Sequence, residues 1–155
     1  MNHRHRHRDI NKMKREAKII GYGSKRIVYD LRNGYVLKVA KSKYGIISNK
    51  REVFAFTTAP PKIKNHLANI LDYGNGYSWI IMKKYPSNLD KSKDYYKRKL
   101  FELTAKFRGN GIIPYEVVNS HEQPNYQNLR LNANGEIVVI DYGNFKFYKS
   151  YFKRR

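Results

Sequence analysis

The sequence predicts an α+β fold in which antiparallel hairpins are separated by helices, and two observations support this prediction. The dipeptide Asn-Gly, which favours the tight turn of a β-hairpin, occurs three times between strand-like runs. Two segments with helical signals lie between these hairpins. Strands do not alternate regularly with helices along the chain, so a parallel sheet is not predicted.

Each Asn-Gly pair joins two runs that are rich in β-branched and aromatic residues, as β-strands are. The pair at residues 33–34 joins RIVYDL to YVLKVA, and the pair at residues 75–76 joins ANILDY to YSWIIMKKY. The pair at residues 134–135 joins NLRL to EIVVIDY. Three antiparallel hairpins are therefore predicted.

Two helices are predicted between the hairpins. In SNKREVFAF, Asn49 can cap a helix whose third residue is Glu52, and the following TTAPP ends it. The second helix falls within residues 89–108, and Gly109 can terminate it. Its apolar residues recur at steps of four, three and four and so share one helical face: Tyr96, Leu100, Leu103 and Phe107.

Composition limits the classes of protein and partner. A chain of 155 residues forms one domain or a small two-lobed unit. Its 32 Lys and Arg against 12 Asp and Glu give a formal charge of +20, which favours partners such as nucleic acid, anionic lipid or an acidic protein. With no cysteine, disulfides and thiolate chemistry are excluded.

The N-terminal residues 1–18 predict a basic, disordered arm, because they show no apolar periodicity. His3, His5 and His7 could bind a transition metal, although a flexible arm lacks groups that orient such ligands. No run approaches the ~20 apolar residues of a membrane helix. We therefore expect a soluble, cytoplasmic protein without a membrane partner.

Chemistry-bearing residues surround the first hairpin. Gly21 and Gly23 precede it, and a glycine pair at a strand turn lets backbone amides approach a phosphate. Lys38 lies on the returning strand among small apolar neighbours, so it requires a partner, for which Glu52 is the candidate. The simpler interpretation is a plain hairpin turn with a lysine at the sheet edge.

The third hairpin ends in a carboxylate. Asp141 directly follows the apolar run IVVI, where burial without a cation or hydrogen-bond donors would be costly. Asn128 lies at the start of the opposite strand and is either a metal ligand or a turn residue. A ligand role is favoured for Asp141.

In this order the residues resemble the protein-kinase-like superfamily, whose signature is G-x-G-x-x-G-x-V, a strand lysine, a helix glutamate, a catalytic-loop asparagine and D-F-G. The matching residues lie within 19–144: Gly21, Gly23, Val28, Lys38, Glu52, Asn128 and the DYG of Asp141 to Gly143. The resemblance implies a minimal kinase-like fold. An antiparallel N-lobe sheet with one helix would occupy residues 19–86, and a much reduced C-lobe, with a helix and a catalytic-loop hairpin, would occupy residues 87–155.

The resemblance also implies ATP and Mg²⁺ as cofactors and phosphoryl transfer of the serine/threonine type, to the protein itself or to a partner. Lys38 would bind the phosphates, with Glu52 orienting it. Asn128 and Asp141 would hold Mg²⁺. Three apolar residues would line the adenine pocket, with the last at its back: Val28, Val36 and Met82.

The chain departs from the kinase signature at the catalytic base. Counting back from Asn128 places Gln123 at the position of the catalytic aspartate, and an amide is not a useful proton acceptor. Aligning Gly111 and Ile112 with the segment before the catalytic loop instead makes Glu116 the base, followed by a seven-residue insertion. Glu122 is a third candidate.

Two further departures concern the glycine loop and the C-terminus. Arg26 replaces the third glycine and could itself contact phosphate. Only residues 144–155 follow the DYG, so we do not expect this chain to form the peptide-binding helices that the kinase resemblance implies. The alternative function is an inactive, pseudokinase-like binding module whose basic surface engages nucleic acid or an acidic protein.

The Lys-, Asn- and Tyr-rich composition suits an AT-rich genome, such as that of a low-GC bacterium or its phage.

Overall fold

A computed structural model of the protein describes residues 8–148. The chain divides into two compact units. The first unit comprises Met1–Thr58 and Asn69–Lys84, and the second comprises Ala59–Ala68 and Tyr85–Arg155. Both strands and helices occur in each unit, so the predicted α+β class is confirmed.

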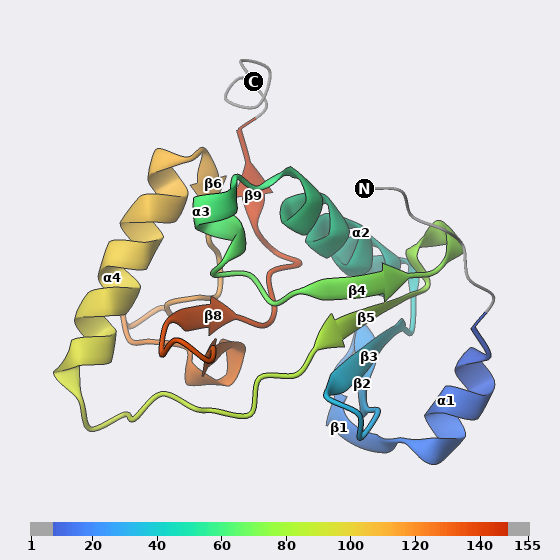
Figure 1. Cartoon of the computed structure of the whole chain (residues 1–155). Helices are drawn as coiled ribbons and strands as arrows, with labels where there is room; N and C mark the ends of the chain where they lie inside the picture. The colour runs from blue at the N-terminus through green and yellow to red at the C-terminus, as the bar shows by residue number, and fades with distance from the viewer. Residues whose placement is uncertain (1–7, 149–155) are drawn as a thin grey trace. The chain divides into compact units, whose positions relative to one another are not determined.

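The first unit is built on a five-stranded antiparallel sheet with the strand order β1-β2-β3-β5-β4 (Figure 1). The predicted hairpins at Asn33-Gly34 and Asn75-Gly76 are confirmed, because β2 pairs with β3 and β4 with β5. The strands are β1 (Lys18–Tyr22), β2 (Arg26–Asp30), β3 (Tyr35–Ala40), β4 (Ile70–Tyr73) and β5 (Trp79–Lys83).

The two faces of this sheet bury different residues, because side chains alternate along each strand. On one face Tyr29, Leu37 and Ile81 form an apolar cluster that helix α1 (Ile10–Glu16) covers through Ile10 and Met13. The other face carries Lys38 and lies against helix α2 (Lys43–Thr58). The sheet is thus packed between two helices.

The predicted disordered arm is wrong for residues 10–16, which form α1. Two local features explain the helix. The carboxylate of Asp9 accepts a hydrogen bond from the Lys12 amide at 3.0 Å, which caps the N-terminus. Ile10 and Met13, three residues apart, supply a small apolar face for the sheet. The prediction for His3, His5 and His7 lies outside the described residues.

The predicted helix around Glu52 exists but begins earlier than Asn49. Helix α2 starts at Lys43, so Asn49 lies in its second turn and is fully buried. The predicted capping box with Glu52 is therefore wrong. The side chain of Asn49 bonds instead to groups outside the helix, which allows an asparagine within the helix. The predicted stop at TTAPP agrees with the end of α2 at Thr58.

In the second unit, helix α4 (Asp94–Gly109) buries Leu100, Leu103 and Phe107, the face predicted from their spacing. The hairpin predicted at Asn134-Gly135 is confirmed by the pairing of β7 with β8. The remaining elements are α3 (Pro61–Lys64), β6 (Ile112–Ile113), β7 (Leu129–Leu131), β8 (Ile137–Val139) and β9 (Lys146–Phe147), and β9 pairs with β6.

Residues 59–68 belong to the second unit, and the N-lobe of residues 19–86 stays a prediction. Backbone hydrogen bonds explain the assignment. The Ala68 amide donates to the Val139 carbonyl at 2.9 Å, and the Val139 amide donates to the His66 carbonyl at 2.8 Å. The buried Tyr142 hydroxyl also donates to the Ala68 carbonyl at 2.7 Å. The segment therefore lies beside β8.

Within residues 8–148, no helix has both the length and the apolar character required to cross a membrane.

Substituting Gly45 tests how closely α2 approaches the sheet. A Cβ atom at this position would lie 2.2 Å from the Lys25 carbonyl oxygen and 3.0 Å from Ala40. Gly45→Ala is therefore expected to lower the free energy of unfolding by about 1–3 kcal/mol through overpacking. Urea denaturation measures the change.

Gly109→Ala is the matched control, because a Cβ at Gly109 meets no atom within 4 Å. This substitution should leave the free energy of unfolding unchanged or raise it by up to about 1 kcal/mol. Equal effects of the two substitutions would show that α2 does not approach the Lys25 carbonyl closely.

Candidate functional site

Three buried charged side chains meet in the first unit between the sheet and α2. The Lys38 ammonium lies 3.1 and 3.2 Å from the two carboxylate oxygens of Glu52. The Arg26 guanidinium hydrogen-bonds to the same carboxylate. Glu52 is 0% exposed, Lys38 5% and Arg26 9%. The pairing of Lys38 with Glu52 predicted from the sequence is thus confirmed, and Arg26 is an additional member.

Strand register places these groups together. Lys38 lies on β3, directly opposite Val28 of β2 and Ile80 of β5. Arg26 is two residues before Val28 on β2, so its side chain emerges on the same face of the sheet. Glu52 reaches this face from the buried side of α2. Two adjacent strands and one helix therefore contribute one charge each.

Asn49 strengthens the connection between Arg26 and α2. Its Oδ1 accepts a hydrogen bond from the guanidinium at 3.0 Å, and its Nδ2 donates to the Tyr77 carbonyl at 2.9 Å. Asn49 precedes Glu52 by three residues, so both side chains lie on the same face of the helix. Arg26 is thereby held at two successive turns of α2.

Arg26 occupies the position of the third glycine in the kinase signature, and its described contacts differ from the predicted phosphate contact. The guanidinium is directed at Glu52 and Asn49. The alternation of side chains along β2 could have predicted that Arg26 lies beside Lys38. Arg26 and Val28 share one face of the sheet, and Val28 is opposite Lys38. Sequence reasoning missed it because the motif assigns this position to a turn.

The glycine pair occupies β1 and the turn that follows. Gly21 is opposite Val28 in the β1–β2 register, and the Gly23 amide donates to the Arg26 carbonyl at 3.0 Å. Lys41, which the motif does not include, donates to the Gly23 carbonyl at 3.0 Å through its ammonium. Its amide also donates to the Lys25 carbonyl at 2.8 Å. Lys41 therefore holds the glycine turn against the end of β3.

The residues predicted to contact adenine lie on the same sheet face as Lys38. Val36 is opposite Met82 in the β3–β5 register, and both are buried. Val28 is half-buried and opposite Lys38. The structure thus brings the apolar candidates and the lysine to one face of the sheet.

In the second unit, Glu116 and Asn128 are joined although twelve positions separate them. The Asn128 side-chain Nδ2 donates to the Glu116 carbonyl at 3.0 Å, and Asn125 donates to the same oxygen at 3.0 Å. Glu116 has a positive φ of 66°, and its side chain is exposed. The backbone of Glu116 is therefore fixed against Asn128 while its carboxylate faces solvent.

The residues between them form a closed loop. The Asn125 amide donates to the Val117 carbonyl at 3.0 Å, and the Asn119 amide donates to the Gln123 carbonyl at 2.8 Å. These bonds close the chain into a loop between Glu116 and Asn128. Glu122 and Gln123 both lie in this loop, whereas Glu116 lies at its base beside Asn128.

Asp141 lies next to the residue that contacts Asn128. The Ile140 amide donates to the Asn128 carbonyl at 2.9 Å, and Asp141 follows half-buried. The next residue, Tyr142, is fully buried. The β7–β8 hairpin therefore brings the two predicted metal ligands, Asn128 and Asp141, to neighbouring backbone positions.

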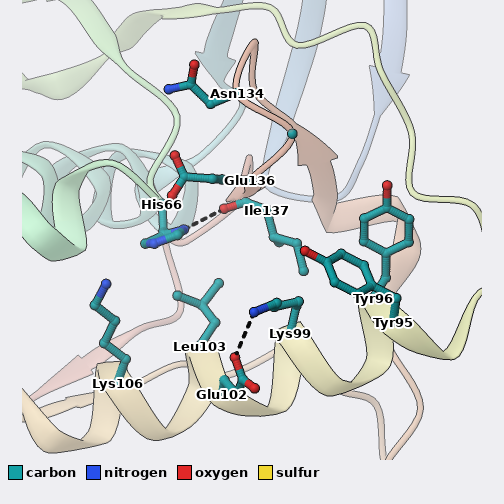
Figure 2. A pocket seen from close by; sticks show the side chains of 11 residues that line it. His66, Tyr95, Tyr96, Lys99, Glu102, Leu103, Lys106, Asn134, Glu136 and Ile137 are labelled. Atoms are coloured by element: carbon teal, nitrogen blue, oxygen red, sulfur yellow. Dashed lines mark hydrogen bonds and ion pairs between the residues drawn. The ribbon is translucent and has the colours of Figure 1, made fainter.

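A separate pocket of about 300 Å³ lies in the second unit between α4 and the β7–β8 turn (Figure 2). In it Lys99 pairs with Glu102 at 3.4 Å, and the His66 Nδ1 lies 2.8 Å from the Ile137 carbonyl. None of the predicted site residues lines this pocket. Its lining includes the Asn134-Gly135 turn, but this pair predicts a hairpin and not a pocket, so the residue pattern did not indicate the pocket.

Comparison with known proteins shows similarity at the level of fold. No family model and no curated protein sequence matches the chain. A co-crystal structure of WbdD with the kinase inhibitor LY294002 aligns with a TM-score of 0.57 at 18% identity, covering 81% of this chain and 32% of that chain. The fold is therefore similar to that of part of WbdD and is compatible with a small kinase-like fold.

Other structures of WbdD agree. One of the bifunctional kinase-methyltransferase aligns with a TM-score of 0.57 at 17% identity, covering 81% of this chain and 31% of that one. A high-resolution structure of WbdD gives a TM-score of 0.57 at 16% identity, covering 82% and 32%. The chain thus spans about a third of the WbdD chains it matches, and the similarity concerns the fold alone.

A double-mutant cycle tests the buried charge cluster. Glu52→Gln would leave two buried cations without their shared carboxylate, and loss of one partner of a buried pair typically costs about 3–5 kcal/mol. Arg26→Met should cost less, because Lys38 still pairs with Glu52. The double variant should lose less stability than the sum of the two single losses. Urea denaturation measures all three.

The control is Lys84→Met. Lys84 pairs with Asp30 at 2.7 Å, but its side chain is 40% exposed, so the loss should be about 0–1 kcal/mol. The Lys84 hydrogen bond holds the pKa of Asp30 below its usual value. Strictly additive losses in the Glu52–Arg26 cycle would show that the two residues do not interact.

Proposed function

We propose that the protein binds Mg-ATP and transfers phosphate, as a serine/threonine-type phosphotransferase acting on itself or on a partner. The observation that carries this proposal is the buried pair of Lys38 and Glu52 on the sheet of a kinase-like fold. Phosphoryl transfer depends chiefly on positioning and charge neutralisation. A lysine held by a carboxylate on a rigid sheet meets the first requirement and supplies a cation for the second.

In this proposal the first unit binds the nucleotide. Lys38 contacts the phosphates, and Gly21 and Gly23 allow the backbone to approach them, because glycine leaves the backbone accessible. Val28, Val36 and Met82 contact the adenine. Support comes from the strand register, which puts these apolar side chains on the same face as Lys38.

Mg²⁺ would be held by Asn128 and Asp141 of the second unit. The Asn128 Nδ2 donates to a carbonyl, which orients the amide and directs its oxygen elsewhere. Within residues 8–148 no hydrogen bond to this buried oxygen is formed. An amide oxygen beside a carboxylate suits Mg²⁺, which commonly takes one or two protein ligands and completes its shell with water and phosphate oxygens. The ion would neutralise charge on the transferring phosphate.

Glu116 is the proposed catalytic base. Its backbone carbonyl accepts a hydrogen bond from Asn128, so the residue lies beside the proposed metal ligand. The two other candidates are less suitable. Glu122 lies in the loop closed by Asn119 and Gln123, and Gln123 itself has no carboxylate that could accept a proton. An exposed glutamate can act as a base if the hydroxyl group that receives the phosphate binds within hydrogen-bond distance of its carboxylate. We further propose that the second unit, with α4 and the β7–β8 hairpin, is a much reduced C-lobe.

One observation favours a second candidate, a nucleotide-binding module without catalytic activity. The residue at the proposed base position is a glutamate at a positive φ, with its side chain exposed to solvent. A general base must be positioned within hydrogen-bond reach of the proton that it removes, and an exposed side chain is held less firmly in such a position. In this case the nucleotide site would serve binding alone.

Nucleotide binding is tested with Lys38→Met and Asp141→Asn. Each substitution should raise the Kd for Mg-ATP at least tenfold, which corresponds to about 1.4 kcal/mol, because each removes one proposed contact with the phosphates or the metal. Isothermal titration calorimetry on the full chain gives the Kd, and circular dichroism shows whether each variant folds. Lys97→Met and Asp90→Asn are the charge-matched controls, since both residues are exposed. Wild-type protein that bound no Mg-ATP would refute the proposal.

Catalysis is tested by comparing Glu116→Gln with Glu122→Gln. Loss of a general base commonly lowers the rate about 10²–10⁴-fold, so Glu116→Gln should do so in autophosphorylation assays with radiolabelled ATP. The Kd for Mg-ATP should stay the same, and Glu122→Gln should match the wild type. Equal rates for both variants would eliminate Glu116 as the base. Mg-ATP binding without any phosphoryl transfer would support the inactive module.

A further inference from the structure

The outward face of α2 combines exposed apolar and cationic side chains. Tyr44 is 57% exposed and Ile47 42% exposed. Residues spaced by three, seven and ten share one helical face, so Tyr44 and Ile47 form a row with Arg51 and Phe54. We refer to Lys43, Tyr44, Ile47, Lys50, Arg51 and Phe54 as the outer row of α2.

The charge of the outer row is entirely positive. Lys43, Lys50 and Arg51 are all exposed. The one acidic residue of α2 is Glu52, which is fully buried on the opposite face with Lys38. No carboxylate on the helix itself therefore neutralises these three cations.

We propose that the outer row of α2 binds an acidic segment of a partner protein, one that presents carboxylates and apolar side chains together. Complementarity of charge and of apolar surface carries this inference. Opposite charges across an interface favour association and set register. Tyr44 and Ile47 would supply the apolar contact, and Lys43, Lys50 and Arg51 would meet the carboxylates.

The arrangement favours an acidic protein segment over a lipid surface. An interfacial helix places its apolar side chains about 5–10 Å into the headgroup boundary and its charges above them. Arg51 lies between Ile47 and Phe54 in the same row, so charged and apolar groups would sit at the same depth. A protein segment can match such an interleaved pattern residue by residue.

Two other occupants fit less well. Nucleic acid would use the three cations for phosphate contacts, but the exposed aliphatic side chain of Ile47 would gain little from a phosphate backbone. A second copy of the chain would bring three cations against three, and like charges facing one another disfavour association.

A synthetic helical peptide of Leu, Glu and Ala, with Leu and Glu on one face, is the probe. Fluorescence anisotropy of the labelled peptide with the full-length protein gives the Kd at low salt and near 0.15 M salt. Arg51→Glu should weaken binding at least tenfold, and Ile47→Ala should weaken it several-fold. Carbodiimide coupling should join peptide glutamates to Lys43 or Lys50, which mass spectrometry identifies.

Arg98→Glu on α4 is the matched control, because Arg98 is also exposed and the change in net charge is the same. It should alter the Kd by no more than about twofold. Equal losses for Arg51→Glu and Arg98→Glu, coupling only at lysines outside α2, or no binding of the peptide would each overturn the proposal. Tighter binding of an oligonucleotide or of phosphatidylserine vesicles, dependent on Arg51, would overturn it in favour of that partner.

These outcomes are independent of the nucleotide site. The outer row and the Lys38–Glu52 pair lie on opposite faces of α2, so none of the substituted residues belongs to the proposed nucleotide site. Loss of Mg-ATP binding in Lys38→Met would leave the peptide experiment unaffected.

Discussion

The first unit depends on one buried carboxylate. Glu52 is fully buried, and an ionised group in that position requires cations and hydrogen-bond donors of good geometry. Lys38 supplies the first cation from β3 and Arg26 the second from β2. The requirement therefore fixes α2 against two strands at once, and it also determines which face of α2 remains outside. Strand register and helix orientation thus follow from the same interaction.

Buried polar groups shape the second unit in a comparable way. The Asn128 amide is buried and must find an acceptor, which it finds in the Glu116 carbonyl. Together with the bond from Asn125 to the same carbonyl, this bond closes the chain around the intervening loop and sets the backbone position of Glu116. The Asn128 carbonyl in turn accepts from Ile140, which places Asp141. In both units, apolar burial drives compaction, whereas the paired polar groups decide which residues come together.

Sequence reasoning succeeded where periodicity or turn chemistry is local. The Asn-Gly turns, the spacing from Leu100 to Phe107, and the need of Lys38 for an acidic partner all follow from near neighbours. It failed where long-range contacts override local preference. From its sequence neighbours alone, Asn49 is predicted to cap the N-terminus of a helix. In the structure its side chain bonds to Arg26 and Tyr77 instead, and the residue lies within the helix. Residues 59–68 show no pattern that points to β8, because their pairing is made through backbone groups.

Two cations on one carboxylate have a consequence for the proposed nucleotide site. A lysine that turned from its glutamate toward a phosphate would ordinarily leave a buried carboxylate without a cation, at considerable cost. Arg26 is held by Asn49 as well as by Glu52. Glu52 therefore keeps a cationic partner when Lys38 shares its ammonium with an anion. In the proposed nucleotide site, an arginine at this position of β2 would keep the Glu52 carboxylate paired while Lys38 contacts a phosphate.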